Sequence, residues 1–193
     1  MNFKAWVRKR KWDILFAIFI GLMLIPSVRM PVMAFVQRVF AGSPSTLAVK
    51  DQKEISSSDW VLIDLEGNQT NLSAASGKVT IVNSWATWCP PCVAEMPSLQ
   101  KLYDKYQNQV AFYFVSNESP ETLKRFLKSK NYNLPVYMPA SNYPKEFDSN
   151  SLPTTYVLDQ NGTIIMEEVG AHNWFSDSFQ EKIEQLLVSP QKE

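Results

Sequence analysis

Residues 79–92 read Val-Thr-Ile-Val-Asn-Ser-Trp-Ala-Thr-Trp-Cys-Pro-Pro-Cys, and this stretch decides the fold. Its first half, Val79 to Trp85, is apolar and β-branched, which predicts a buried strand. A helical pattern follows, because Cys92, Met96, Leu99 and Tyr103 recur at the spacing of one helix face. Proline suits the first helical position, which Pro90 would occupy. The two cysteines are therefore predicted where a strand ends and a helix begins.

That position has chemical consequences for the two thiols. The first turn of a helix presents unpaired N–H groups and a partial positive charge. Both stabilise a thiolate at Cys89, so we expect its pKa to be low and its reactivity high. Cys92 lies one turn further in, close enough for a disulfide with Cys89, and should be less exposed. The pattern predicts that Cys89 attacks a substrate and Cys92 resolves the product.

The cysteine pair could also be a structural disulfide, part of a zinc site or a chance occurrence. A structural disulfide across two residues closes a very small loop and constrains the unfolded chain little. A zinc site normally needs four ligands, whereas the chain has two cysteines and one distant histidine, His172. A chance pair is disfavoured by the placement between strand and helix. Redox chemistry is the favoured interpretation.

Residues 82–92 resemble the thioredoxin superfamily, specifically its membrane-anchored TlpA/ResA-like branch. Trp85 and Trp88 match the tryptophans before the family's CxxC motif. Pro97 matches the proline that kinks the active-site helix, where proline otherwise removes a hydrogen bond. Glu95 matches an acidic residue of the TlpA/ResA-like branch. The resemblance implies a thioredoxin-like α/β fold, with a central mixed sheet flanked by helices and an N-terminal β-hairpin.

One departure from thioredoxin concerns proton transfer. Thioredoxin has a buried aspartate six residues before its first cysteine, where this chain has Asn83. An asparagine does not titrate, so the resemblance leaves Glu95 as the candidate third catalytic group beside Cys89 and Cys92. If its helix face points to the core, burial raises the pKa of Glu95 towards neutrality. The alternative is a solvated glutamate that only favours the first turns of its helix.

A second landmark is the stretch Leu152-Pro153 before the β-rich run Thr154–Leu158. Proline cannot donate to a strand ladder, so Pro153 belongs where a strand begins. The resemblance implies more, namely a cis peptide that faces the CxxC motif across the site. It also implies that the residues around the cysteines bind the substrate, and these are Trp88, Pro90, Pro91, Leu152 and Pro153.

The rest of the domain shows ordinary strand and helix signals. Strands are expected at 60–65, 110–116, 134–138 and 163–169, and helices at 120–130, within 141–150 and in a closing segment with Phe175, Phe179, Ile183, Leu186 and Leu187. Asn161-Gly162 is a strong hairpin-turn signal. His172 lies in a loop after the last strand, where an exposed, non-catalytic residue is favoured over a pH-sensitive group near the site.

The N-terminus combines a basic head with an apolar run. Lys4 and the basic cluster 8–11 precede Ile14–Val28, and after Arg29 the chain is apolar again to Val36. This pattern favours an uncleaved, N-in membrane anchor over a cleaved signal peptide or a buried core helix. The expected organisation is a cytoplasmic head at 1–12, an anchor at 13–36, a linker at 37–58, the thioredoxin-like domain at 59–188 and a tail at 189–193.

Composition limits the function classes. The 193 residues have a formal net charge of zero, which gives no support for nucleic-acid binding. The expected enzyme is an extracytoplasmic thiol–disulfide oxidoreductase, most simply a reductase, that needs no cofactor beyond the Cys89–Cys92 disulfide. The resemblance implies a transmembrane thiol donor as partner, and cytochrome c maturation as a common task, with apocytochrome c as the corresponding substrate. Two alternatives remain open: an oxidase of secreted proteins, and a non-catalytic binding or chaperone module.

Overall fold

The structure is a computed structural model that describes residues 10–25, 28–29, 32, 44, 53–55, 60–147 and 150–188. Its elements in chain order are α2 (Lys11–Met23), β1 (Lys53–Glu54), β2 (Val61–Asp64), β3 (Gln69–Asn71), the 3-10 helix η2 (Leu72–Ala75), β4 (Thr80–Ser84), α4 (Pro90–Tyr106), β5 (Ala111–Val115), α5 (Pro120–Lys130), β6 (Val136–Pro139), the 3-10 helix η3 (Lys145–Phe147), β7 (Thr154–Leu158), β8 (Thr163–Val169) and α6 (Asp177–Val188).

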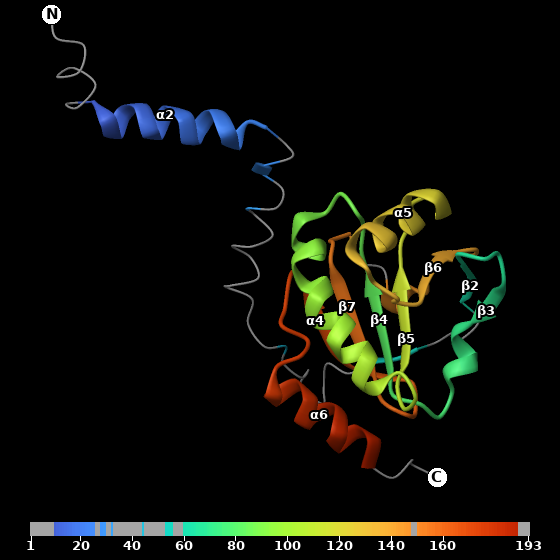
Figure 1. Ribbon diagram of the computed structural model, residues 1–193. Coiled ribbons are helices and arrows are strands. Elements are labelled where there is room, and N and C mark those ends of the chain that lie inside the picture. The colour runs from blue at the N-terminus through green and yellow to red at the C-terminus, as the bar shows by residue number, and fades with distance from the viewer. Residues whose placement is uncertain are drawn as a thin grey trace, which may run out of the picture.

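The strands form one mixed sheet of eight strands in the order β1-β8-β7-β4-β5-β6-β2-β3 (Figure 1). β4 pairs in parallel with β5, and β5 with β6, while β4 pairs antiparallel with β7. The parallel pairs need helical crossovers, which α4 and α5 supply. The predicted N-terminal hairpin is present as β2 and β3, and β2 joins it to the sheet through β6. The predicted thioredoxin-like α/β architecture is therefore confirmed.

The two faces of the sheet bury two separate hydrophobic clusters. Alternate residues of β4 divide between them, because Ile81 joins one cluster and Val82 the other. The first cluster contains the inward side chains of α4, α5 and α6, the three helices drawn in green, gold and red in Figure 1. The second is covered by residues of the 3-10 helices, including Leu72 and Phe147. The longest helix, α4, therefore packs its cysteine end against the central strand.

Two expected boundaries differ from the structure. The linker expected at 37–58 contains strand β1, whose Lys53 and Glu54 pair with Ile164 and Thr163 of β8. The sheet therefore begins before residue 59, because β8 offers a free edge that these residues close. The closing helix begins at Asp177, after Phe175, and the helix expected within 141–150 is only the three-residue turn η3. By contrast, α5 has the predicted bounds.

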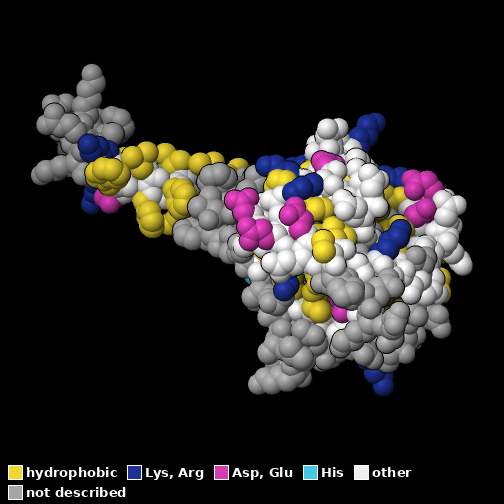
Figure 2. Space-filling view, turned by 90° about the horizontal axis from the view of Figure 1, so that it is seen from below, with side chains coloured by type: hydrophobic (Ala, Val, Ile, Leu, Met, Phe, Trp, Pro, Cys, Tyr) yellow, Lys and Arg dark blue, Asp and Glu magenta, His cyan; other side chains and the backbone are white. Residues whose placement is uncertain are grey.

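Only part of the predicted anchor is described. α2 is 13 residues long and covers the anchor from Asp13 to Met23, and its side chains are largely hydrophobic and exposed, as Figure 2 shows in yellow. Within the described ranges, no helix has both the length and the apolar character that crossing a membrane requires. Residues 1–9, most of 26–43, most of the expected linker and the tail 189–193 lie outside the described residues.

Candidate redox site

The two cysteines form a disulfide at the N-terminus of α4. Cys89 is the N-cap residue, and its Sγ accepts the backbone N–H of Cys92 at 3.3 Å. Pro90 takes the first helical position, as predicted, because a residue there needs no N–H partner within the helix. The Cys89 sulfur therefore lies where a helix terminus favours negative charge.

Both sulfur-bearing residues are buried in this oxidised form. Cys89 is 3% exposed and Cys92 is 0% exposed, and both belong to the hydrophobic cluster beneath α4. The expectation that Cys89 would be an exposed thiol is wrong for this state, because the bridge turns its sulfur towards Cys92. The expected order of exposure is present, but the difference is small.

The predicted cis peptide is present between Leu152 and Pro153. β7 starts directly after it, and Thr154 of β7 is paired with Ser84, the last residue of β4. Cys89 follows the end of β4, so the register brings Pro153 to the same end of the sheet as the disulfide. The Pro153 carbonyl accepts the N–H of Gly170, which ties this turn to the loop after β8.

Exposed apolar side chains lie at this end of the sheet, two in loops and one at the last residue of β8. Trp88 is 64% exposed, Val169 is 55% exposed and Leu152 is 36% exposed. Pro90 and Pro91, which are also predicted to bind substrate, are partly buried, whereas Pro153 is buried. Binding of a partner that covers large exposed apolar groups lowers the free energy, because it removes apolar surface from water. This arrangement suits the docking of a protein or peptide against the sulfur of Cys89.

The side chain of Glu95 is buried in the core next to this site. It is 2% exposed, although it is a charged residue on the same helix as the cysteines. Asn83 Nδ2 donates to its Oε1 at 2.8 Å, and Trp174 Nε1 donates to its Oε2 at 2.8 Å. The backbone N–H of His172 adds a third donor at 3.3 Å. The prediction that the Glu95 face points to the core is confirmed.

Burial raises the pKa of Glu95 from its ordinary value of 4.5 to about 7. The hydrogen bonds from Trp174, Asn83 and His172 act in the opposite direction, because they stabilise the carboxylate. Desolvation is the larger effect, so the group exchanges a proton near neutral pH. Such a group is suited to proton transfer in thiol chemistry.

Asn83 connects Glu95 to the strand that follows the cis-proline. It is completely buried on β4, and its Nδ2 also donates to Thr155 Oγ1 at 2.8 Å. Asn83 and Thr155 are register partners of β4 and β7. The amide of Asn83 thus holds the carboxylate without titrating, in the place where thioredoxin has an acid. Sequence reasoning missed Thr155 and Trp174, and only the strand pairing would have indicated Thr155.

His172 lies closer to the site than expected. Its side chain is 19% exposed, and its Nε2 lies 3.3 Å from Glu168 Oε2. The expectation of an exposed loop residue is therefore wrong, because the loop after β8 folds back so that its backbone reaches Glu95. The role of His172 in holding Glu95 is carried by its main chain and does not depend on a histidine side chain.

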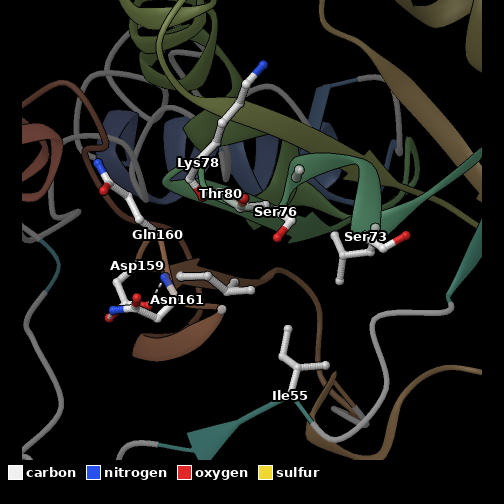
Figure 3. Close-up of a pocket in the computed structure, with 13 residues that line it drawn as sticks. Ile55, Ser73, Ser76, Lys78, Thr80, Asp159, Gln160 and Asn161 are labelled. Atoms are coloured by element: carbon white, nitrogen blue, oxygen red, sulfur yellow. Dashed lines mark hydrogen bonds between the residues drawn. The ribbon is translucent and has the colours of Figure 1, made fainter. Parts of the chain in front are cut away.

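A cavity of about 270 Å³ at the opposite end of the sheet is separate from the redox site (Figure 3). Its lining includes Lys78 and Thr80, where β4 begins, and Asp159 and Asn161 of the β7–β8 turn. The disulfide follows the other end of β4, so this cavity does not contain the reacting sulfurs. The cysteine pair lies instead at the end of the sheet where Pro153 is found.

Comparison with known proteins identifies the family. A model of the AhpC/TSA family matches residues 53–166, which include both cysteines, Glu95 and the cis-proline. The chain belongs to this family. Within it, the intact CxxC motif and the relatives below make this AhpC/TSA protein a TlpA/ResA-like member of the thioredoxin superfamily and an oxidoreductase.

Two relatives and one solved structure illustrate the similarity. The chain is 35% identical over 116 residues to the thioredoxin-like protein YneN of Bacillus subtilis, covering 58% of this chain and 68% of the relative. It is 35% identical to the thiol-disulfide oxidoreductase ResA of Halalkalibacterium halodurans, and the match covers 58% of this chain and 65% of that relative. A crystal structure from Chlorobium tepidum, assigned as a thiol:disulfide interchange protein DsbE, superposes with a TM-score of 0.61 at 23% identity. The superposition covers 71% of this chain and 98% of that chain. The match thus spans about two thirds of the two relatives.

Proposed function

We propose that this AhpC/TSA-family protein is a reductase of protein disulfides that acts outside the cytoplasm. The observation that carries the proposal is a disulfide at a helix N-terminus beside a buried carboxyl group, Glu95, whose pKa is about 7. The exposed apolar side chains around Cys89 support a protein substrate, because they offer a surface that a partner would cover.

The reaction starts from the dithiol form. The Cys89 thiolate attacks one sulfur of a substrate disulfide, so that a bond forms between enzyme and substrate and the substrate bond breaks. The Cys92 thiolate then attacks Cys89 Sγ, which releases the second substrate thiolate and restores the Cys89–Cys92 disulfide. Two electrons and two protons pass from the enzyme to the substrate in each cycle.

Glu95 is proposed as the third catalytic group in the second step. Cys92 must lose a proton before it attacks, and the leaving substrate thiolate must gain one. A buried carboxylate with a pKa near 7 can accept the first proton and return it to the leaving thiolate. In the proposal, Asn83, Trp174 and His172 keep the carboxylate oriented during both transfers.

The equilibrium with glutathione tests the direction of electron flow. We expect a reduction potential near that of reducing thioredoxins, about −270 mV, because the proposed function supplies electrons to substrates. Alkylation of thiols at defined glutathione ratios, followed by mass spectrometry, would measure it. A value near the roughly −120 mV of strongly oxidising periplasmic enzymes would reject the reductase assignment and favour an oxidase.

We further propose that the N-terminal segment anchors the enzyme with its domain on the outer side of the cytoplasmic membrane. The exposed apolar side chains of α2, the basic head before it and the apolar residues up to Val36 support an anchor. Such a location is oxidising, so re-reduction of the enzyme needs a transmembrane thiol donor. Cytochrome c maturation, with apocytochrome c as substrate, is the proposed setting.

The topology has a direct test. A reporter that is active only in the cytoplasm, fused after Glu193, should give no signal, while the protein should sediment with membranes and resist extraction by high salt. The same reporter placed before Met1 should be active. A soluble product that starts near Gly42 would instead show that the segment is a cleaved signal.

A further inference from the structure

The loop before the cysteines is held by a carboxylate from another part of the chain. Glu118, which lies between β5 and α5, reaches back to Thr87, two residues before Cys89. The Thr87 backbone N–H donates to Glu118 Oε2 at 2.6 Å, and Thr87 Oγ1 donates to Oε1 at 2.6 Å. Both residues are partly buried. Two short bonds to one ionised group form a stronger contact than two neutral hydrogen bonds.

Other hydrogen bonds fix the ends of this loop, and its first residues, Trp85 and Ala86, are buried in the core. The Trp85 N–H donates to the Val115 carbonyl at 3.0 Å, and the Cys89 N–H donates to the Ala86 carbonyl at 3.2 Å. Within the part of the chain that the structure describes, Glu118 is the one side chain that hydrogen-bonds to residues 85–88. The position of Thr87 and of the exposed Trp88 therefore depends on this contact, whereas Cys89 is held in addition by its disulfide and by its bond to the Ala86 carbonyl.

In the part of the chain that the structure describes, the charge of Glu118 has no cationic partner. Its remaining contact is with Ser116, whose Oγ lies 3.4 Å from Oε2. Among the described residues, the ion pairs are those of Lys105, Lys124 and His172, and none of them involves Glu118. A partly buried negative charge held two residues before Cys89 repels a thiolate there, whereas it has little effect on the neutral disulfide.

We propose that Glu118 is a positioning residue of the redox site that also lowers its reduction potential. Its two bonds to Thr87 hold Trp88 and Cys89 in place, and its charge favours the disulfide over the thiolate. It thereby opposes the α4 terminus, which favours the thiolate. The inference rests on the proposed thiol–disulfide exchange and deepens it, because a lower potential makes the dithiol a stronger reductant.

Glu118→Gln separates the charge from the contact. A glutamine oxygen can accept the Thr87 N–H, while its amide group donates to Thr87 Oγ1, so both contacts are retained with the hydroxyl reversed. We expect the variant to shift the glutathione equilibrium about tenfold towards the dithiol, which corresponds to a potential about 30 mV higher. Iodoacetamide should label Cys89 of the reduced variant faster than that of the wild type at mildly acidic pH.

Two further variants isolate the contact. Thr87→Val keeps the charge and the backbone bond but removes the hydroxyl donor, so the equilibrium should stay unchanged while exchange with a protein disulfide slows. Glu118→Ala removes charge and contact together, and should show both effects. Glu181→Gln, which removes an exposed carboxylate on α6, is the matched control for charge and should change neither quantity.

The outcomes distinguish this inference from the proposed function. An unchanged equilibrium constant and labelling rate in Glu118→Gln, with a circular dichroism spectrum like that of the wild type, would overturn the inference. An equal shift in Glu181→Gln would also overturn it, because the effect would then follow net charge. If wild-type enzyme exchanges with glutathione but reduces no protein disulfide, the proposed function fails, while a specific shift in Glu118→Gln still supports the role of Glu118.

Discussion

Replacing Cys92 with serine is expected to stop turnover and to accumulate a mixed disulfide between Cys89 and the substrate. The first attack needs only the Cys89 sulfur, which lies at the helix N-terminus and accepts the Cys92 N–H. That backbone donor is retained in Cys92→Ser. The second attack needs a thiol at position 92, so the intermediate has no internal route to release. Non-reducing gel electrophoresis of extracts from cells that express the variant should show new high-mass bands that disappear with a reductant.

Cys89→Ser is the matched control, because it also leaves one cysteine in the site. Its remaining thiol belongs to a residue that is 0% exposed and lies beneath the first turn of α4. We therefore expect no mixed disulfide and no activity. Equal trapping by both variants would show that the two cysteines do not have distinct roles. Bands in neither variant would argue against a protein-disulfide substrate and would favour a binding module.

The second large effect concerns Glu95 and the dependence of stability on pH. The folded-state pKa of Glu95 is about 7, above the value of 4.5 expected for the unfolded chain, so the folded state binds more protons between these two values. Stability therefore falls as pH rises from 4.5 to 7, because in this window the carboxyl group ionises in the unfolded chain while it stays protonated in the folded protein. By linkage, a shift from 4.5 to about 7 corresponds to a loss of about 3 kcal/mol across this window. Below pH 4.5 the carboxyl group is protonated in both states, so the free energy of unfolding no longer depends on its titration.

Glu95→Gln should remove this pH dependence and slow the release of the mixed disulfide. Glutamine has a similar shape, and Asn83 Oδ1, a buried acceptor without a partner among the described residues, can accept from its amide if the Asn83 amide turns. We expect little loss of stability at acidic pH and a flatter stability curve than that of the wild type up to about pH 8. Urea unfolding at several pH values and the pH–rate profile of release measure the two effects. A profile like that of the wild type would make Glu95 a structural residue only.

A tryptophan variant tests the same carboxylate without changing it. Trp174→Phe removes the N–H that donates to Glu95 and stabilises its charged form, so the pKa of Glu95 should rise further. The midpoint of the pH–rate profile should therefore move to higher pH. Trp60→Phe is the matched control, because Trp60 is equally buried but belongs to the other cluster and its Nε1 has no described partner. A common shift in both variants would point to general loosening of the core.

Local sequence signals predicted most of the elements around the site. The strand before the CxxC motif, the proline at the start of α4, the bounds of α5 and the Asn161-Gly162 turn were all predicted correctly. These signals depend on residues within a few positions of one another, because propensity, capping and turn geometry act over that range. The cis peptide at Pro153 was implied by the resemblance alone, since proline by itself favours the trans form.

The sequence by itself determined which residues are candidates for the chemistry, whereas the tertiary structure decided their environment. A CxxC motif between strand and helix places two thiols at a helix terminus wherever it occurs. No local pattern shows that Glu95 meets Trp174, 79 positions away, or that Glu118 holds Thr87 across 31 positions. Those contacts depend on how β4, β5 and β7 pair and on how the loops at their ends close. Burial and neighbouring donors set the proton affinity of a carboxyl group, so only the packed structure decides that Glu95 titrates near 7.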